Sequence, residues 1–350
     1  MITIVVVVTI LLALLAEGAI RFRQHLKYGQ SNPSVTTLYK TDQATGLRLL
    51  VAGAKQGDLI INKQGFRGPA IPLSKPEKTI RIAFIGASTT FSAEVRKIED
   101  TWPHLVTQTL KARFKNRNFD YINAGVPGFT VQESLKNLKY RVGKFNPDII
   151  FIYYATNDFS SDVRDLAGRK GNKVEKPQED SWLTRNSVLW FLLKKQIVVW
   201  HRQRSAAKPS AKKFTFDAKE LSKLFEKRLG NLTQESKRTA KLVVLATFSP
   251  RLRQSLSPEE RIKAAITAAY YMPHISITNM IKGYEQYNTV IRKVARKNKV
   301  VLVDVADKIP PDGTHYNDSV HFREAGSREM AKYVISKILD PVGKLVTAQK

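Results

Sequence analysis

The chain has 350 residues and no cysteine, so disulfides and thiolate metal sites are excluded. Its apolar fraction of 43% is typical of a globular protein rather than a disordered one. Lys and Arg outnumber Asp and Glu by 58 to 30, giving a formal net charge of +28. Such a field favours anionic partners, which include nucleic acid, acidic lipid headgroups and acidic polysaccharides.

The first twenty residues are predicted to form a membrane anchor. Residues 2–16 carry no charge, and a helix extended to Ile20 would rise about 30 Å, the thickness of the hydrocarbon core. A cleaved signal peptide is one alternative, although a basic leading region and an obvious small-x-small cleavage site are missing. A buried core segment is the other alternative.

Two arguments predict opposite orientations for this anchor. Arg21, Arg23 and Lys27 follow the apolar segment, and the positive-inside rule would keep them, with the main domain, in the cytoplasm. The family resemblance described below favours the opposite side of the membrane.

Residues 21–78 are predicted to be a polar linker or N-terminal extension, with turn chemistry at residues 62–68. From residue 79 onward, apolar strands alternate with helical segments. The predicted strands are 79–85, 119–123, 148–154, 241–247 and 300–305, and the main helices are 102–114, 131–142, 277–298 and 324–339. This alternation predicts an α/β fold with a five-stranded parallel sheet covered by helices on both faces.

Residues 159–240 are too long for a single crossover and are predicted to contain an insertion. The segment holds a Trp-rich apolar stretch (182–200), a linker (205–213) and a helical run (217–239). Eight basic residues and no acidic residue lie between Asp180 and Asp217: Arg185, Lys194, Lys195, Arg202, Arg204, Lys208, Lys212 and Lys213. These charges form either an ordinary solvated surface or a surface for an anionic partner.

Five residues lie just after predicted strands, where the loops of a parallel sheet gather and ligands bind. They are Ser88, Gly125, Asn157, Asp318 and His321. A serine hydroxyl needs a base to become a nucleophile. An imidazole can supply that base, and a carboxylate on its other nitrogen fixes the tautomer. The aspartate three positions before the histidine is suited to this role.

The order of these blocks resembles that of the SGNH, or GDSL-type, hydrolase superfamily, over about residues 79–340. The resemblance implies a flavodoxin-like three-layer α/β/α fold. It also implies Ser88 as nucleophile, His321 as base and Asp318 as its partner, with an oxyanion hole from the N–H groups of Ser88 and Gly125 and the side-chain amide of Asn157. Neither a cofactor nor a metal ion is implied.

Two positions depart from the family motifs. The usual Gly-Asp-Ser is Gly86-Ala87-Ser88, and the usual Gly-x-Asn-Asp begins with Ala155. Asp158 is predicted to stabilise its loop. The remaining histidines with no evident partner spacing are predicted to be structural or surface residues: His104, His201, His274 and His315.

These observations predict a membrane-anchored serine esterase or deacylase that forms an acyl-enzyme. The charge and the anchor indicate an acidic envelope carbohydrate or a lipid as the carrier of the ester. Residues 62–67 also resemble membrane-anchored bacterial members of the superfamily, which implies a catalytic domain outside the cytoplasm. The alternatives are an O-acyltransferase using the same site and a non-catalytic carbohydrate- or lipid-binding module. Nucleic-acid binding is supported by net charge alone.

Overall fold

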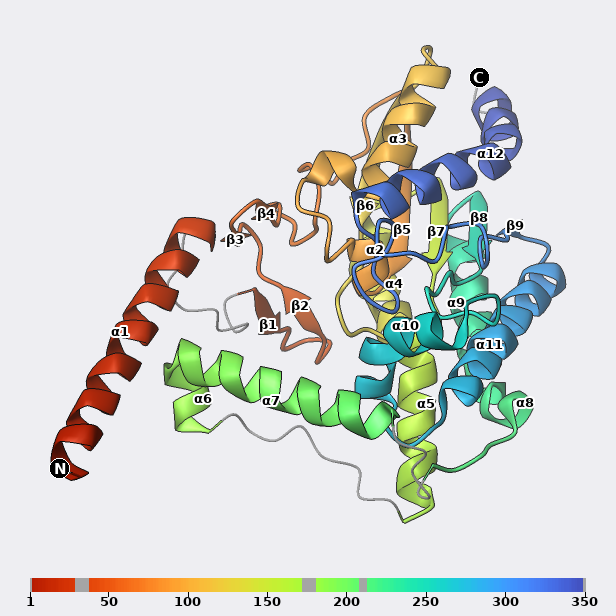
Figure 1. The fold of residues 1–350 in the computed structure, drawn as a ribbon. Helices are drawn as coiled ribbons and strands as arrows, with labels where there is room; N and C mark the ends of the chain where they lie inside the picture. The colour runs from red at the N-terminus through yellow and green to blue at the C-terminus, as the bar shows by residue number, and fades with distance from the viewer. Residues whose placement is uncertain (1, 29–37, 172–180, 208–212, 349–350) are drawn as a thin grey trace.

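The computed structural model describes residues 2–28, 38–171, 181–207 and 213–348. Figure 1 shows a central sheet with helices on both sides and a long N-terminal helix at the margin of the molecule. Parts of the predicted linkers, residues 29–37 and 208–212, lie outside the described residues.

The central sheet has five strands, as predicted. They are β5 (Thr79–Gly86), β6 (Asn118–Asn123), β7 (Ile149–Tyr153), β8 (Leu242–Ala246) and β9 (Val301–Val303). The strand order is β6-β5-β7-β8-β9 and every pairing is parallel. All residues of β5 and β7 are buried, as expected for strands covered on both faces.

Helices cover the two faces of the sheet and complete the predicted three-layer fold. On one face α3 packs against α12, and on the other α9 packs against both α4 and α11. Their bounds are α3 (Trp102–Arg113), α4 (Val131–Tyr140), α9 (Lys223–Thr239), α11 (Ile277–Asn298) and α12 (Glu324–Ala348). Thr101, which precedes α3, does not cap the helix with its side chain, because its hydroxyl donates to the carbonyl of Ile98.

The strand register aligns the carboxyl ends of the three strands that lead to the predicted site. Phe84 of β5 pairs with Asn123 of β6, and Gly86 pairs with Tyr153 of β7. The loops that follow β5, β6 and β7 therefore leave the sheet side by side. The predicted site residues on these loops are brought to one edge.

The N-terminal extension differs from the predicted polar linker, because residues 38–78 are built into the domain. They form two antiparallel hairpins, β1 (Tyr39–Thr41) with β2 (Arg48–Leu50) and β3 (Lys55–Gln56) with β4 (Leu59–Ile60). Buried apolar side chains of the extension pack in two clusters, Leu38, Leu50 and Ile61 with Phe91, and Leu47 and Leu49 with Val126 and Phe129. The sequence did not predict that the extension packs on the domain, because its apolar residues show no helix or strand periodicity.

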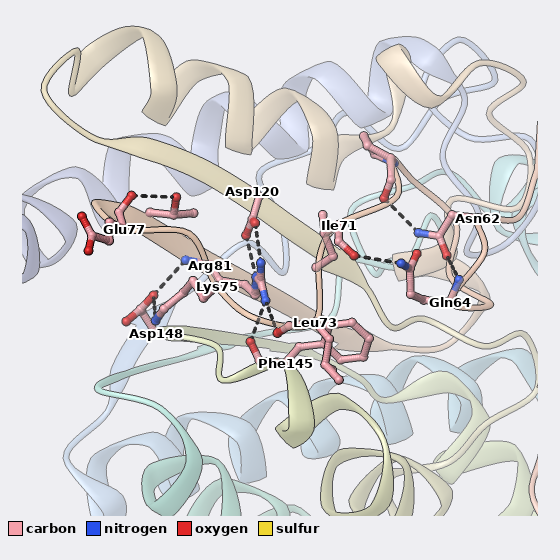
Figure 2. A network of polar contacts seen from close by, with 12 residues as sticks. Asn62, Gln64, Ile71, Leu73, Lys75, Glu77, Arg81, Asp120, Phe145 and Asp148 are labelled. Carbon is pink, nitrogen blue, oxygen red and sulfur yellow. Dashed lines mark hydrogen bonds and ion pairs between the residues drawn. The ribbon is translucent and has the colours of Figure 1, made fainter.

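A buried polar network joins the later part of the extension to the sheet (Figure 2). The guanidinium of Arg81, which is fully buried in β5, donates to both carboxylate oxygens of Asp120 at 2.9 and 2.7 Å. It also donates to the carbonyls of Leu73 and Phe145. Lys75 donates to Asp148 at 2.6 Å, and Asp148 accepts the Arg81 backbone N–H. The buried charge of Arg81 is therefore paired and hydrogen-bonded, as burial requires.

Of the remaining α-helices in the described residues, five precede β8 in the chain and one follows it. They are α2 (Ser88–Phe91), α5 (Thr156–Arg169), α6 (Trp182–Asn186), α7 (Val188–Ala207), α8 (Ala218–Leu221) and α10 (Pro258–Tyr271). The Trp-rich stretch predicted inside the insertion forms α6 and α7. The N-terminal helix α1 (Ile2–Tyr28) contains a 21-residue apolar segment, Thr3–Arg23, that is long and apolar enough to cross a membrane. A signal sequence has the same length and composition.

Candidate active site

Ser88 begins a short helix directly after the central strand β5. The strand ends at Gly86, and α2 begins two residues later. A Cβ at Gly86 would lie 1.8 Å from Thr90 Oγ1, so the tight approach of strand and helix requires glycine. The turn leaves Ser88 half-buried at the start of α2, and its backbone N–H has no acceptor among the residues described.

Asp318, His321 and Ser88 form a continuous row of hydrogen bonds, although Ser88 is 233 residues from His321. His321 Nδ1 lies 2.8 Å from Asp318 Oδ2, and His321 Nε2 lies 2.8 Å from Ser88 Oγ. An ionised carboxylate only accepts hydrogen bonds, so Nδ1 carries the proton and Nε2 accepts the Ser88 hydroxyl. This is the arrangement in which an imidazole can remove the serine proton.

The turn that carries His321 is fixed from both sides. The other carboxylate oxygen of Asp318 accepts the backbone N–H groups of Val320 and His321 at 2.8 and 2.9 Å. Ser319 is buried, its hydroxyl accepts the N–H of Ala268 in α10 at 3.0 Å, and its carbonyl accepts the N–H of Arg251. The imidazole is thus oriented by a rigid turn and does not depend on the single contact with Ser88.

Electrostatics favour a charged Asp318 and a more basic His321. Burial lowers the pKa of His321, but the hydrogen bond to Asp318 and the negative charges of Asp318 and Glu94 outweigh it, so the pKa is raised above its usual value. Burial raises the pKa of Asp318, but the contact with His321 and two backbone N–H groups outweigh it, so this pKa falls below its usual range. The carboxylate therefore stays ionised and stabilises an imidazolium.

Asn157 uses one side-chain N–H to contact a neighbouring loop. It is the second residue of α5, which follows β7, and one N–H of its side chain donates to the carbonyl of Phe129 at 2.8 Å. A primary amide has two N–H groups, so the second is available to a ligand. The contact also ties the end of β7 to the loop after β6.

Gly125 does not have the environment of an oxyanion donor. Its N–H donates to the side-chain oxygen of Asn123 at 3.1 Å. A Cβ at this position would lie 2.5 Å from the nitrogen of Phe91 and 2.9 Å from the carbonyl oxygen of Ala87. Glycine is therefore required because the loop packs against α2. The contact with Asn123 contradicts the predicted role of the Gly125 N–H.

Gly128, three residues later, has the open N–H that Gly125 lacks. Residues 126–129 form a turn closed by the Phe129 N–H and the Val126 carbonyl at 3.1 Å, and Gly128 has a φ of +90°. Nothing lies within 4 Å of the position that a Cβ would take, and the Gly128 N–H has no acceptor in the described part of the chain. The loop is joined to the turn before Ser88, because the Val126 N–H donates to the Gly86 carbonyl at 3.2 Å. The Pro127-Gly128 pair, typical of a turn with positive φ at glycine, was the signal in the sequence.

A buried arginine from the extension supports the segment that follows Ser88. The guanidinium of Arg67 donates to the carbonyls of Phe91 and Ser92 at 2.9 and 2.6 Å, and to those of Val95 and Arg96 at 2.5 and 3.1 Å. Arg67 is only 2% exposed, and burial lowers its pKa to about 10, which leaves it charged at neutral pH. Sequence reasoning missed this residue; the turn residues around it gave no sign of its partner.

The family model of the GDSL-like lipases and acylhydrolases matches residues 84–329 of the 350-residue chain. The chain belongs to this family. It is therefore a hydrolase that acts on ester bonds, and its five-stranded α/β fold is the one that the sequence predicted. The matched region includes Ser88, Gly128, Asn157, Asp318 and His321.

Solved structures similar to this GDSL-type hydrolase include the acetylxylan esterase Axe2 from Geobacillus stearothermophilus. It is 17% identical, with a TM-score of 0.44, and the alignment covers 74% of this chain and 94% of that chain. LAE5, an alpha/beta hydrolase from the metagenome of Lake Arreo in Spain, is 16% identical with a TM-score of 0.45 and the same coverages. At these values neither protein informs the substrate of this hydrolase. No curated protein sequence matches the chain at a significant level.

The departures from the usual GDSL motifs leave the contacts of Ser88 intact. Ala87 is 3% exposed, and its carbonyl accepts the N–H groups of Thr90 and Phe91 at 3.1 and 2.8 Å. Ala155, at the other departure, is also buried and precedes α5. Both positions are filled by small apolar side chains that the packing accommodates.

Asp158 links three elements below the site. Its carboxylate accepts the N–H of Val131 at 3.1 Å and lies 3.3 Å from the guanidinium of Arg228 in α9. Burial raises the pKa of Asp158 to about 7, although Arg228 and the Val131 N–H act in the other direction. These contacts join α5 to the start of α4 and to α9, in agreement with the predicted stabilising role.

Three of the other histidines have partners of their own. His104 is 3.3 Å from the Tyr121 hydroxyl, His274 stacks on Phe214, and His315 contacts Asp312 at 2.8 Å. The side chain of His201 lies outside what the structure describes. Within the described residues, no group of three or more His, Asp or Glu side chains is arranged to hold a metal ion.

Proposed function

We propose that the chain is a serine esterase in which Ser88 is the nucleophile, His321 the general base and Asp318 the partner that orients and stabilises the imidazolium. The observation that carries this proposal is the row of two 2.8 Å hydrogen bonds from Asp318 through His321 to Ser88. The end of the row is a half-buried serine at the carboxyl edge of a parallel sheet, where such folds bind ligands.

The reaction proceeds through an acyl-enzyme. Ser88 Oγ attacks the ester carbonyl carbon while its proton moves to His321 Nε2. The tetrahedral intermediate collapses as that proton passes to the leaving alkoxide, which departs as an alcohol. Water then attacks the acyl-Ser88 ester with His321 again as base, and collapse returns the proton to Ser88 and releases the carboxylic acid.

The oxyanion is bound by three donors from three loops: the N–H of Ser88, the N–H of Gly128 and the free amide N–H of Asn157. The first two N–H groups lack acceptors among the described residues, and Asn157 keeps one N–H unused. Each such donor typically contributes roughly 3 kcal/mol to the transition state. Gly128 replaces Gly125 in this assignment.

The substrate that we propose is an O-acyl group on an acidic envelope carbohydrate or on a lipid. The support is the net charge of +28, which attracts anions, and the apolar helix α1, which would hold the enzyme at a membrane. We further propose that α1 stays as an anchor and that residues 79–340, with residues 38–78 packed against them, form the hydrolase domain on the outer side. Protease added to intact spheroplasts would digest an outer domain, and protection until lysis would contradict this orientation.

A panel of acyl esters of rising chain length tests the activity. Wild-type protein should hydrolyse at least one ester and should be labelled by a fluorophosphonate, and Ser88→Ala should lose both properties with an unchanged circular dichroism spectrum. Comparable turnover by the folded alanine variant would rule out Ser88 as nucleophile. Transfer of the acyl group to an added sugar in place of water would show an acyltransferase using the same acyl-enzyme.

A further inference from the structure

The helix α7 carries an exposed apolar stripe. Trp190, Leu193 and Ile197 are 42%, 46% and 53% exposed, and their spacing of three and four residues places them on one face of the helix. Trp182 and Leu183, on the preceding helix α6, are also exposed. A contiguous exposed patch of large apolar side chains is unusual on a soluble protein and marks an interaction surface.

The same helices are held to α1 at Glu17, the first charged residue of that helix. One carboxylate oxygen of Glu17 accepts the N–H of Val188 at 2.9 Å, and the other accepts the N–H of Leu189 at 2.8 Å and the Ser187 hydroxyl at 2.9 Å. Arg21 contacts Glu17 at 2.7 Å and also donates to the Asn186 carbonyl. A side chain of α1 thus caps the first turn of α7, which fixes the two helices to each other.

The position of Glu17 defines where α7 would lie relative to a bilayer. Glu17 is the first charged residue after the uncharged residues 2–16 and lies within one helical turn of Ile20, where a span of about 30 Å would end, so it would sit near the interface of a membrane-crossing α1. In Figure 1, α7 runs across the direction of α1, from α1 toward α5 and α10. A helix that is attached at the level of Glu17 and runs across the span would lie along the membrane surface.

The composition of α6 and α7 fits that position. Tryptophan is enriched at membrane interfaces, and three of the four tryptophans of the chain, Trp182, Trp190 and Trp200, lie in these two helices. By sequence, α7 also carries Lys194, Lys195, Arg202 and Arg204 and no acidic residue. Basic and aromatic residues together are typical of helices that lie in the headgroup layer of anionic membranes.

We propose that α6 and α7 form a second membrane contact, which lies in the headgroup region of an anionic bilayer beside α1, with the Trp190–Leu193–Ile197 stripe facing the acyl chains. Such helices bury their apolar face about 5–10 Å deep. The proposal requires that α1 crosses the membrane. On its other side α7 packs against α10, and α10 binds the turn of His321 through Ser319. The active site is therefore held at a fixed height over the lipid surface.

Tryptophan fluorescence tests the proposal on the full chain, because the fourth tryptophan, Trp102, is fully buried and α1 contains none. The protein is reconstituted into vesicles of phosphatidylcholine and phosphatidylglycerol that contain lipid brominated near the headgroup or near the chain end. We expect strong quenching by the first lipid, weaker quenching by the second, and protection from acrylamide relative to the detergent-solubilised protein.

A matched pair of variants gives the control. Leu193→Glu should lose most of the quenching by brominated lipid, whereas Leu224→Glu, at a residue 55% exposed on the distant helix α9, should keep it. Hydrolysis of a soluble ester by both variants shows that they are folded. Ser88→Ala should keep the quenching, so a failure of the esterase proposal leaves this test unaffected.

Two results would overturn the proposal. One is fluorescence that brominated lipid leaves unchanged while acrylamide still quenches it, which would place the stripe in water. The other is acrylamide protection that rises with protein concentration in detergent, which would mean that a second copy of the chain covers the stripe.

Discussion

Removal of the Arg67 guanidinium should weaken both the fold and the active site. Arg67→Met keeps most of the apolar stem and removes all four hydrogen bonds to the carbonyls that follow Ser88. These carbonyls belong to residues 91, 92, 95 and 96, and Ser92 among them has a left-handed φ of +61°. The segment has an unfavourable backbone conformation that the arginine stabilises.

The magnitude follows from the number and kind of hydrogen bonds that the substitution removes. A hydrogen bond to a charged group contributes roughly 1.5–3 kcal/mol, and contributions that share one guanidinium are not additive. The substitution leaves four carbonyls without their donor, and an unsatisfied buried acceptor costs about 1–3 kcal/mol, so we expect the free energy of unfolding to fall by about 3–5 kcal/mol. A displacement of Ser88 by about 1 Å can lower the rate about 10²-fold, so kcat should fall on this scale with a smaller change in KM.

Arg141→Met is the matched control. Arg141 is partly buried, its pKa is lowered to about 10 by burial as that of Arg67 is, and it donates to the carbonyls of Gln64 and Gly65. It has no contact with the segment after Ser88. Urea unfolding and ester hydrolysis at a temperature where each variant is folded separate the two effects. If folded Arg67→Met has the kcat of Arg141→Met, the supporting role of Arg67 is refuted.

Three further predictions concern the residues around Ser88. Asn157→Ala should lower kcat by about 10² or more with a smaller effect on KM, because the amide acts on developing charge; a rise in KM alone would make it a substrate-binding residue. Gly125→Ala should destabilise the protein, because a Cβ would lie 2.5 Å from the Phe91 nitrogen. Gly128→Ala has space for its Cβ and should mainly lower kcat, because it disturbs a turn with positive φ. The urea midpoints and the kinetics of the two variants distinguish these outcomes. The kcat/KM should fall on acidification through a pKa above the usual histidine value, since only neutral His321 accepts the proton; a flat profile from about pH 5 to 8 would argue against a histidine base.

The raised pKa of His321 also links pH to stability, with the opposite sign. Because the folded protein binds this proton more tightly than the unfolded chain, the stabilisation is complete below the unfolded pKa of about 6.5 and is lost as pH rises through the folded pKa. The contribution of His321 to stability thus declines over the range in which activity rises. Comparison of urea midpoints of wild type and His321→Gln across this range would measure it.

The sequence predicted the sheet, and it predicted that Ser88, Asp318 and His321 would lie together, because both depend on strong local signals. Five apolar strands with helices between them specify a parallel sheet, and the end of each strand specifies which loop a polar residue occupies. Ser88, Asp318 and His321 met because strands β5 and β9 deliver their loops to the same edge. Asn157 was predicted at this edge for the same reason, and it lies at the start of α5, which follows β7.

The parts that the sequence did not predict depend on contacts with no local pattern. Gly125 and Gly128 lie in one loop, and only the backbone shows that the first N–H is taken by Asn123 while the second is open. Arg67 lies in a polar segment, and its four partners are carbonyls, which every residue type possesses. The same holds for Glu17, whose partners are the N–H groups at the start of α7.

The packing of the hairpins has a practical consequence for any soluble recombinant form. The family match begins at residue 84 and the sheet at residue 79, so a chain trimmed to begin with β5 would contain every strand of the sheet. Without residues 38–78, Phe91, Val126 and Phe129 would be exposed to water. Such a fragment would aggregate or lose the support of its nucleophile helix, whereas one that begins at residue 38 would keep that support and omit only the apolar helix and the segment that joins it.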